Sequence, residues 1–213
     1  MKLYYFETLN PRKACAVAKY LGSAVEFVRI DLAKGENRTP EFLAINPNGK
    51  VPALTDAITR LWEADAIMAY LAKADKSDLL PTDERQIDVM RWLSWNAHHF
   101  TRHAGSLYFH HIIKPAFGLG EPDRKAVAEA TAFFKQFAQV LNDHLSGRKY
   151  LLGDTLTIAD FSVAVTLPYA EQAKLPLDGF AEIERWHARL NELPAWREPF
   201  PARNERSSLS QGY

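Results

Sequence analysis

Val51 carries backbone groups that can pair with an extended ligand. It lies in residues 46–54, Asn-Pro-Asn-Gly-Lys-Val-Pro-Ala-Leu, where two prolines and a glycine predict a loop that leads into a buried strand. Pro52 cannot donate to a strand ladder, so it belongs at the edge or the start of that strand. The N–H and C=O of Val51 then stay free, and a cis Val51-Pro52 bond would turn them outward. The alternative is an ordinary corner between a loop and a strand.

Other residues with reactive or metal-binding side chains are less informative. Five of the seven histidines fall within residues 98–111, and His99 and His103 have the i, i+4 spacing that suits a metal ion. No acidic or cysteine ligand lies beside them, so the sequence predicts no metal site. The single cysteine, Cys15, is predicted to be a small buried residue inside a helix rather than a nucleophile.

The bulk composition predicts a cytoplasmic protein without a nucleic-acid or membrane partner. The chain has 213 residues, 47% of them hydrophobic, enough for one sizeable core or two small ones. Its 26 basic residues balance 26 acidic ones and form no basic block. One cysteine excludes an internal disulfide framework and fits a reducing compartment. The N-terminal apolar run is too short for a signal peptide, and no stretch reaches the roughly 18 apolar residues of a membrane span.

A β-α-β unit is predicted for the start of the chain. Residues 2–6 and 25–30 have strand patterns, and residues 11–21 between them carry one apolar helical face. Asn10 is the predicted N-cap of that helix. The two strands are expected to be parallel. Residues 7–10 then lie at the carboxyl end of a strand and the amino end of a helix, where small ligands and anions tend to bind.

The rest of the chain completes this domain and adds a second one. After residue 54 a tight hairpin, a further strand and a helix complete an α/β domain, which we place at residues 1–74. Residues 75–83 have the composition of a linker. Strand patterns vanish beyond it, so residues 84–200 are predicted to form an all-helical domain. From Pro199 onward the chain is polar and is expected to fray.

Four motifs in this order resemble those of the cytosolic glutathione transferases, and the resemblance covers nearly the whole chain. Residues 46–54 resemble the family's Asn-Pro-x-Gly-x-Val-Pro segment, and residues 63–67, Glu-Ala-Asp-Ala-Ile, resemble Glu-Ser-x-Ala-Ile. Residues 153–160 resemble the N-capping box of the sixth helix. The segments most similar to the plant phi class and its bacterial relatives are residues 35–38, 95–100 and 114–115.

The resemblance implies a thioredoxin-like N-terminal domain that binds glutathione, followed by the all-helical C-terminal domain. Glutathione is a peptide with two carboxylates and one ammonium, so its site needs backbone pairing and placed charges. In the family, the valine before the cis proline, here Val51 before Pro52, pairs with the cysteinyl part. The cations Lys50 and Arg38, with Asn37 as a neutral donor, are placed to meet the glycyl carboxylate.

The γ-glutamyl end of glutathione is assigned by the resemblance to the start of the helix that follows the hairpin. The N–H groups near Ala64 and Asp65 can take its carboxylate, and Glu63 can hold its ammonium. Ala64 stands where the family usually has serine, and the lost hydrogen bond costs about 1 kcal/mol, which weakens binding without abolishing it. Asp65 is a second departure, because many relatives carry a basic or neutral residue there.

The implied chemistry is activation of the glutathione thiol. A free thiol with a pKa of about 8.5 is mostly protonated at neutral pH, and a donor aimed at the sulfur lowers that pKa. In the phi-like pattern the donor is a hydroxyl about four residues ahead of an arginine, and Thr8 precedes Arg12 by four. Thr8 is the first candidate and the donor amide of Asn10 the second. Tyr5 matches classes that use a tyrosine, and capping of the loop is the alternative role for Thr8.

We therefore expect a homodimeric, metal-free glutathione S-transferase of the detoxification type. It would bind glutathione as co-substrate in the first domain and a small, largely apolar electrophile between the domains. The aromatic candidates for that acceptor pocket are Tyr108, Phe109 and Phe117. Two alternatives stay open: a glutathione-dependent peroxidase, isomerase or dehalogenase, and a non-catalytic glutathione-binding or regulatory protein on the same fold.

Overall fold

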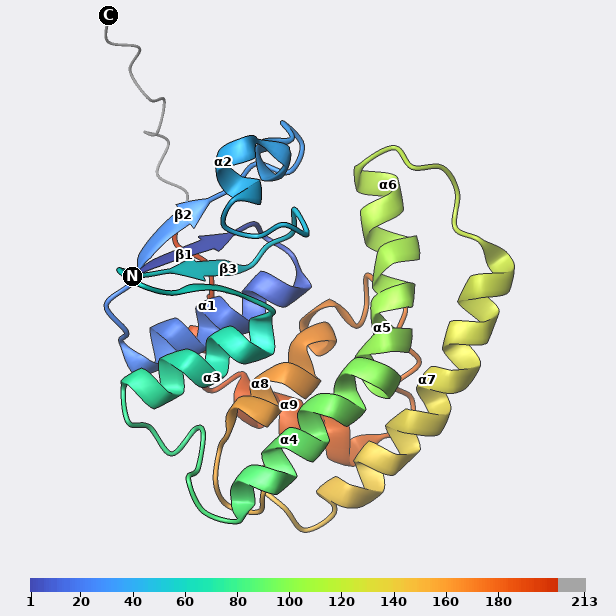
Figure 1. The fold of residues 1–213 in the computed structure, drawn as a ribbon. Coiled ribbons are helices and arrows are strands. Elements are labelled where there is room, and N and C mark those ends of the chain that lie inside the picture. Colours follow the sequence, from blue (N-terminus) through green and yellow to red (C-terminus); the bar gives the residue numbers. More distant parts are fainter. Residues whose placement is uncertain (203–213) are drawn as a thin grey trace, which may run out of the picture.

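A four-stranded mixed sheet in the order β2-β1-β3-β4 forms the N-terminal domain of the computed structural model, which describes residues 1–202 (Figure 1). Strand β1 (Lys2–Tyr5) runs parallel to β2 (Glu26–Arg29) and antiparallel to β3 (Ala53–Thr55). Strand β4 (Arg60–Trp62) pairs with β3 as a tight hairpin. This topology confirms the predicted β-α-β unit and the thioredoxin-like fold class.

Two helices cover one face of this sheet. Helices α1 (Leu9–Leu21) and α3 (Ala64–Ala74) pack against each other below it, while the short helix α2 (Pro40–Leu43) lies on the other side (Figure 1). The apolar face predicted for the first helix is buried, and Cys15 within it is fully buried, as predicted. A 3₁₀ turn over Glu36–Arg38 precedes α2.

Helix α1 begins earlier than its sequence pattern predicts. The prediction that Asn10 is the N-cap is wrong: that position is Thr8, with an extended backbone (φ −135°, ψ 175°), and Asn10 lies in the first turn. Pro11 has no N–H, and the N–H groups of a first turn need no acceptor within the helix, so the helix can begin ahead of it. The Arg12 N–H makes the first helical bond, to the Thr8 carbonyl at 3.1 Å.

The strand register brings three loops to one edge of the sheet. Ala53 pairs with Tyr4 on one side and with Trp62 on the other. Since Tyr4 is near the end of β1, the segment after β1, the segment before β3 and the segment after β4 all leave the sheet at the same edge. Thr8, Val51 and Glu63 lie in these three segments. Residues far apart in the sequence thereby converge on a single ligand-binding edge.

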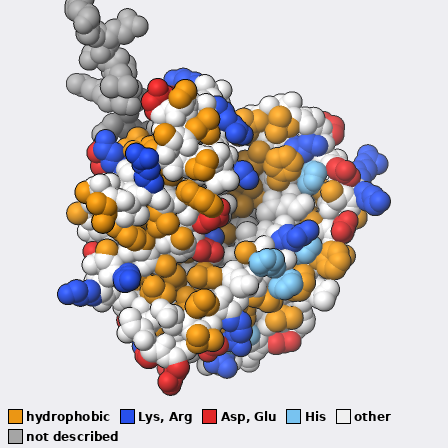
Figure 2. Space-filling model, viewed as in Figure 1, with side chains coloured by type: hydrophobic (Ala, Val, Ile, Leu, Met, Phe, Trp, Pro, Cys, Tyr) orange, Lys and Arg blue, Asp and Glu red, His pale blue; other side chains and the backbone are white. Residues whose placement is uncertain are grey.

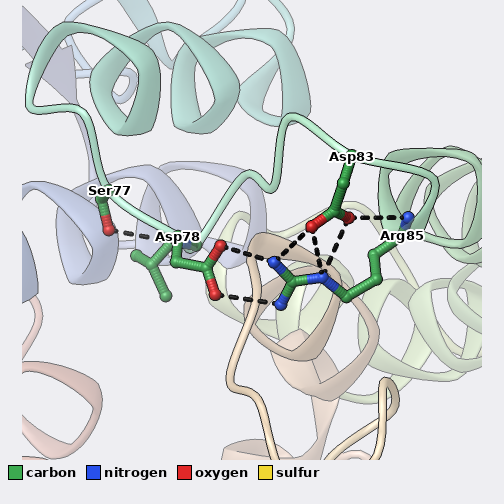
Figure 3. A network of polar contacts seen from close by, with 5 residues as sticks. Ser77, Asp78, Asp83 and Arg85 are labelled. Atoms are coloured by element: carbon green, nitrogen blue, oxygen red, sulfur yellow. Dashed lines mark hydrogen bonds and ion pairs between the residues drawn. The ribbon is translucent and has the colours of Figure 1, made fainter.

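An arginine at the start of the second domain fixes the path between the domains. The two terminal nitrogens of Arg85 donate to Asp78 at 2.9 and 3.0 Å, and its Nε donates to Asp83 at 2.9 Å (Figure 3). Ser77 Oγ accepts from the Leu79 N–H at 3.2 Å. Exposed ion pairs contribute little stability singly, so the main effect expected of this network is to hold the segment between Asp78 and Arg85 in one conformation. The division of the domains at residues 75–83 stays a prediction.

The second domain contains only helices and 3₁₀ or π turns, apart from isolated bridges, among the described residues. One long helical rod runs from α4 to α6, with a π turn on each side of α5. Helix α7 packs beside it, and α8 and α9 lie behind (Figure 1). The helices are α4 (Arg85–Trp95), α5 (Thr101–Tyr108), α6 (Lys114–Ala116), α7 (Arg124–Leu145), α8 (Ile158–Val163), α9 (Ala181–Leu190) and α10 (Pro194–Arg197).

Asp160 organises the core of the helical domain. It forms the predicted capping box with Thr157, whose backbone N–H donates to Asp160 Oδ2 at 2.9 Å. Its other oxygen accepts from the Leu151 N–H at 2.9 Å and from the Trp186 indole at 3.0 Å. The fully buried carboxylate thus ties three segments of the domain together, because each donor would be unsatisfied without it.

The end of the described chain is held by the first domain. The Lys19 ammonium donates to the carbonyls of Glu198 and Phe200 at 2.6 and 2.7 Å. The expectation that the chain frays from Pro199 onward is therefore wrong for Phe200, and for residues 203–213 it lies outside the described part. The reason is tertiary: the partner on α1 is nearly 180 residues away in the sequence.

Candidate functional site

A pocket of about 470 Å³ opens between the two domains. Figure 2 shows the surface hollowed between the N-terminal domain and the helical domain. One wall comes from the start of α1 and the loop before β3, and the other from the end of the helical rod. The lining residues are Thr8, Leu9, Asn10, Leu32, Val51, Tyr108, Ile113, Phe117 and Leu119.

The start of α1 presents hydrogen-bond donors to this pocket. Thr8 is the N-cap, yet its side chain makes no capping hydrogen bond, so the capping role is not observed. Leu9 and Asn10 open the helix, where N–H groups lack acceptors within the helix. The Thr8 hydroxyl and these N–H groups therefore form a donor cluster at the positive end of a helix, which suits an anion.

Val51 contributes backbone rather than side-chain chemistry. The Val51-Pro52 bond is cis, and within the described residues the Val51 N–H and C=O make no hydrogen bond. Asn46 shapes this loop: its Nδ2 donates to the Lys50 carbonyl at 2.6 Å, and its Oδ1 accepts from the Asn48 N–H at 3.1 Å. Asn46 was not predicted as a site residue, although its place before a proline and a glycine is a turn signal.

The predicted charged residues lie outside the pocket lining. Arg38, Lys50 and Glu63 are exposed. Asn37 donates to the Gly49 carbonyl at 2.7 Å, so this side chain joins the 3₁₀ turn to the loop before Val51. The pocket therefore gathers Thr8, Asn10 and Val51 but not these four residues.

Helix α3 starts from an unusual backbone conformation. Glu63 has φ 70° and ψ 118°, a region that non-glycine residues rarely adopt, and Ala64 behind it is buried. Such a conformation costs about 1–3 kcal/mol and tends to occur at functional sites. It lets the chain turn sharply from β4, so that the first-turn N–H groups of α3 point beyond the same edge of the sheet.

The opposite wall of the pocket is apolar with one hydroxyl. Tyr108 and Phe117 line it as expected, whereas Phe109 does not, and Ile113 and Leu119 were not foreseen. Burial raises the pKa of the Tyr108 hydroxyl, so it stays protonated. Because these residues come from the C-terminal half of a helical rod, only the tertiary structure brings them opposite Thr8.

Arg12, one turn after Thr8 on α1, carries a buried cation. The Arg12 guanidinium donates to the Trp196 carbonyl at 2.5 Å and lies 5.6 Å from the centre of the Tyr169 ring. No carboxylate within the described residues forms an ion pair with it, and burial lowers its pKa. A positive charge four residues after Thr8 favours an anion at the start of α1.

The histidines of residues 98–111 form no metal-binding group with other described residues. His99 and His103 stack on Phe137, with ring centroids 4.7 and 5.6 Å away. No group of three or more His, Cys, Asp or Glu residues that could hold a metal ion occurs in the described part of the chain. Likewise, none of the described helices is long and apolar enough to cross a membrane.

Comparison with known proteins identifies the family. The model of the glutathione S-transferase N-terminal domain matches residues 1–73, and that of the C-terminal domain matches residues 100–194. Glutathione S-transferase 3 of Zea mays is 32% identical over 211 residues, which cover 95% of this chain and 94% of the relative. The chain belongs to the glutathione S-transferase family. The plant relatives agree with the resemblance to the phi class.

Solved structures of glutathione S-transferases share the fold. Glutathione S-transferase I from maize, in complex with an atrazine glutathione conjugate, has a TM-score of 0.83 and 30% identity, covering 93% of this chain and 95% of that one. A bacterial family member from Pseudomonas fluorescens, with two glutathione molecules bound, has a TM-score of 0.84 and 25% identity over 93% of this chain and 91% of its own. This glutathione S-transferase therefore has relatives in both plants and bacteria.

Proposed function

We propose that this chain is a glutathione transferase that activates the glutathione thiolate for attack on a small, largely apolar electrophile. The observation that carries the proposal is the shared pocket of Thr8 and Val51: an uncommitted hydroxyl at a helix N-terminus faces the same space as unpaired strand-like backbone. Val51 would pair with the cysteinyl residue of glutathione, which brings its sulfur to the donor cluster.

Thr8 and the start of α1 would stabilise the sulfur anion. A hydroxyl that donates to a thiolate favours the charged form and lowers the thiol pKa. The helix N-terminus and the buried Arg12 cation act in the same direction. The donor amide of Asn10 is the second candidate for the contact with sulfur. The thiolate then attacks the electrophilic carbon, a C–S bond forms, and the electron pair leaves with the leaving group or is protonated at the adjacent atom.

The two ends of glutathione would be held by charges around the pocket. Lys50 and Arg38 are free to meet the glycyl carboxylate, and the place of Asn37 against the loop supports its role beside them. At the other end, the N–H groups at Ala64 would take the γ-glutamyl carboxylate, and Glu63 its ammonium. Pro52 would set the turn that leaves the Val51 backbone groups unpaired.

The acceptor would lie against the apolar wall of the same pocket. Ile113, Phe117 and Leu119 offer hydrocarbon and aromatic surface within reach of the donor cluster. This lining supports an apolar electrophile, because burial of apolar surface supplies affinity without hydrogen bonds. Tyr108 adds one hydroxyl that can donate to a polar group of the acceptor.

The test is to titrate the thiol of bound glutathione by its ultraviolet thiolate absorbance across pH. Wild type should show a pKa well below that of free glutathione, and Thr8→Ala should restore the free value. If Asn10→Ala, and not Thr8→Ala, has this effect, the sulfur donor is Asn10. A bound thiol with an unshifted pKa in wild type would contradict activation and favour the non-catalytic alternative.

We also propose that the protein is a cytoplasmic homodimer. Large apolar side chains are exposed on both domains, Ile58 and Trp62 around β4 and Ile87 and Met90 on α4. Figure 2 shows hydrophobic side chains on the surface of both domains in that view. Such surfaces support a two-fold interface in which the first domain of one copy meets the second domain of the other. Light scattering should give twice the 24.2 kDa chain mass, and Ile87→Asp combined with Met90→Asp should give a monomer.

A further inference from the structure

Lys13 and Asp65 form a buried ion pair between the two helices that start at the proposed glutathione site. The Lys13 ammonium lies 2.7 Å from Asp65 Oδ1, with 6% of the lysine side chain and 26% of the aspartate side chain exposed. Lys13 is the fifth residue of α1, and Asp65 is the second residue of α3. The pair therefore joins the helix that meets the sulfur to the helix that meets the γ-glutamyl end.

A serine of the second domain forms hydrogen bonds with both members of this ion pair. Ser162 Oγ on α8 donates to Asp65 Oδ1 at 2.8 Å and accepts from the Lys13 ammonium at 3.1 Å. Asn96 Nδ2 donates to Ser162 Oγ at 3.1 Å and to its carbonyl at 3.0 Å, and Thr101 Oγ1 donates to Asn96 Oδ1 at 2.6 Å. Satisfied buried networks of this kind hold their members in one geometry.

The residues at the start of α3 make the position of this helix important for binding of the γ-glutamyl carboxylate. Ala64 offers no hydroxyl, so the γ-glutamyl carboxylate would depend on backbone N–H groups, whose direction is set by the position of the helix as a whole. Asp65 also places a negative charge beside that carboxylate, and Lys13 neutralises it. An unpaired Asp65 would repel the ligand, and a displaced α3 would present its N–H groups at the wrong angle.

We propose that Lys13 and Asp65 are positioning residues for glutathione, which set the start of α3 relative to α1 and thereby align the γ-glutamyl subsite with the thiol subsite. This inference rests on the proposed function. The pair acts through the backbone of α3 and touches no reacting atom. Asp65, one of the two departures from the family motif, thus has a local partner that compensates for its charge.

The test compares two ligands that differ only at the γ-glutamyl end, S-hexylglutathione and S-hexylcysteinylglycine, by calorimetry. In Asp65→Asn, which keeps the side-chain shape, the Kd of S-hexylglutathione should rise about tenfold, while that of S-hexylcysteinylglycine should change less than about twofold. Lys13→Met should raise the Kd of S-hexylglutathione more than Asp65→Asn does, because it also leaves the Asp65 charge unpaired beside the γ-glutamyl carboxylate. The double variant should lose less than the sum of both, because no buried charge is left unpaired.

Glu182→Gln is the matched control, since it breaks a partly exposed ion pair, with Arg185 on α9, that lies outside this network. It should leave both dissociation constants unchanged even where it lowers the melting temperature. The inference is overturned if Asp65→Asn and the double variant weaken both ligands equally or neither. If wild type binds S-hexylglutathione no better than S-hexylcysteinylglycine, the γ-glutamyl subsite of the proposed function itself is wrong.

Discussion

The ring of Phe200 stacks on the ring of Tyr5, with centroids 5.8 Å apart and planes inclined by 15°. Phe27 meets the same ring edge-on at 6.1 Å. Tyr5 is buried in this aromatic stack and does not line the pocket that Thr8 faces. A residue near the end of the chain thus holds the tyrosine that a different class of glutathione transferases would use for catalysis.

Tyr5→Phe should therefore leave thiol activation intact. We expect the turnover number to change less than about twofold, whereas Thr8→Val, which keeps the side-chain shape and removes the donor, should lower it about 100-fold. Steady-state kinetics at saturating glutathione and a common electrophile checks both. A large loss in Tyr5→Phe with little change in Thr8→Val would show that the sulfur donor is the tyrosine.

Asn46→Ala should weaken glutathione binding without direct contact to the ligand. The variant loses the bond to the Lys50 carbonyl and those from Asn48, so the loop that presents Val51 is no longer held. We expect a destabilisation of about 2 kcal/mol and a higher KM for glutathione, with a smaller effect on kcat. Asn48→Ala is the control, because it removes only the side-chain bond of an exposed residue. Equal effects of the two variants would contradict the role of Asn46.

The sequence predicted the elements whose signals are local. Alternating apolar residues predicted the strands, and the prolines on either side of Val51 located the unpaired backbone before β3. The strand register then explains why distant motifs meet, since Tyr4 and Trp62 flank Ala53. The predicted β-α-β unit was enough to foresee that the start of the first helix lines a pocket.

Features that depend on tertiary contacts were not predictable in this way. The place of Phe200 depends on Tyr5 and Lys19, from the other end of the chain. The start of α1 at Leu9 was missed for a local reason, because a first helical turn tolerates Pro11. Ile113 reaches the pocket only because the long helical rod passes the first domain. Charged side chains such as Arg38 carry no burial pattern, so their roles rest on the family resemblance and stay predictions.

Cys15 should be unreactive in the folded protein. It is fully buried in α1, and burial strongly raises the pKa of its thiol, so almost no thiolate is present at neutral pH. Labelling with a chromogenic disulfide reagent should be negligible in buffer and should reach one thiol per chain in denaturant. Cys15→Ala should retain activity. Rapid labelling of the native protein, or loss of activity in this variant, would contradict the role of Cys15 as a core residue.

His187 should make stability depend on pH in a defined direction. Burial lowers its pKa to about 4, and the charge of Arg12 adds to this effect. In the unfolded chain the pKa is about 6.5, so between these values the unfolded chain binds a proton that the folded chain does not. Stability should therefore fall as the pH is lowered from about 6.5 to about 4, by up to about 3 kcal/mol.

Urea unfolding of wild type and His187→Leu at several pH values measures this contribution. The free energy of unfolding of wild type should fall more steeply with acid than that of the variant, because His187 takes up its proton only in the unfolded chain. In the folded chain its Nε2 is buried and has no hydrogen-bond partner within the described residues. His98→Leu is the control, since His98 is exposed. Parallel pH profiles for wild type and His187→Leu would mean that the imidazole is protonated in the folded state, and that the buried Arg12 cation does not oppose this charge.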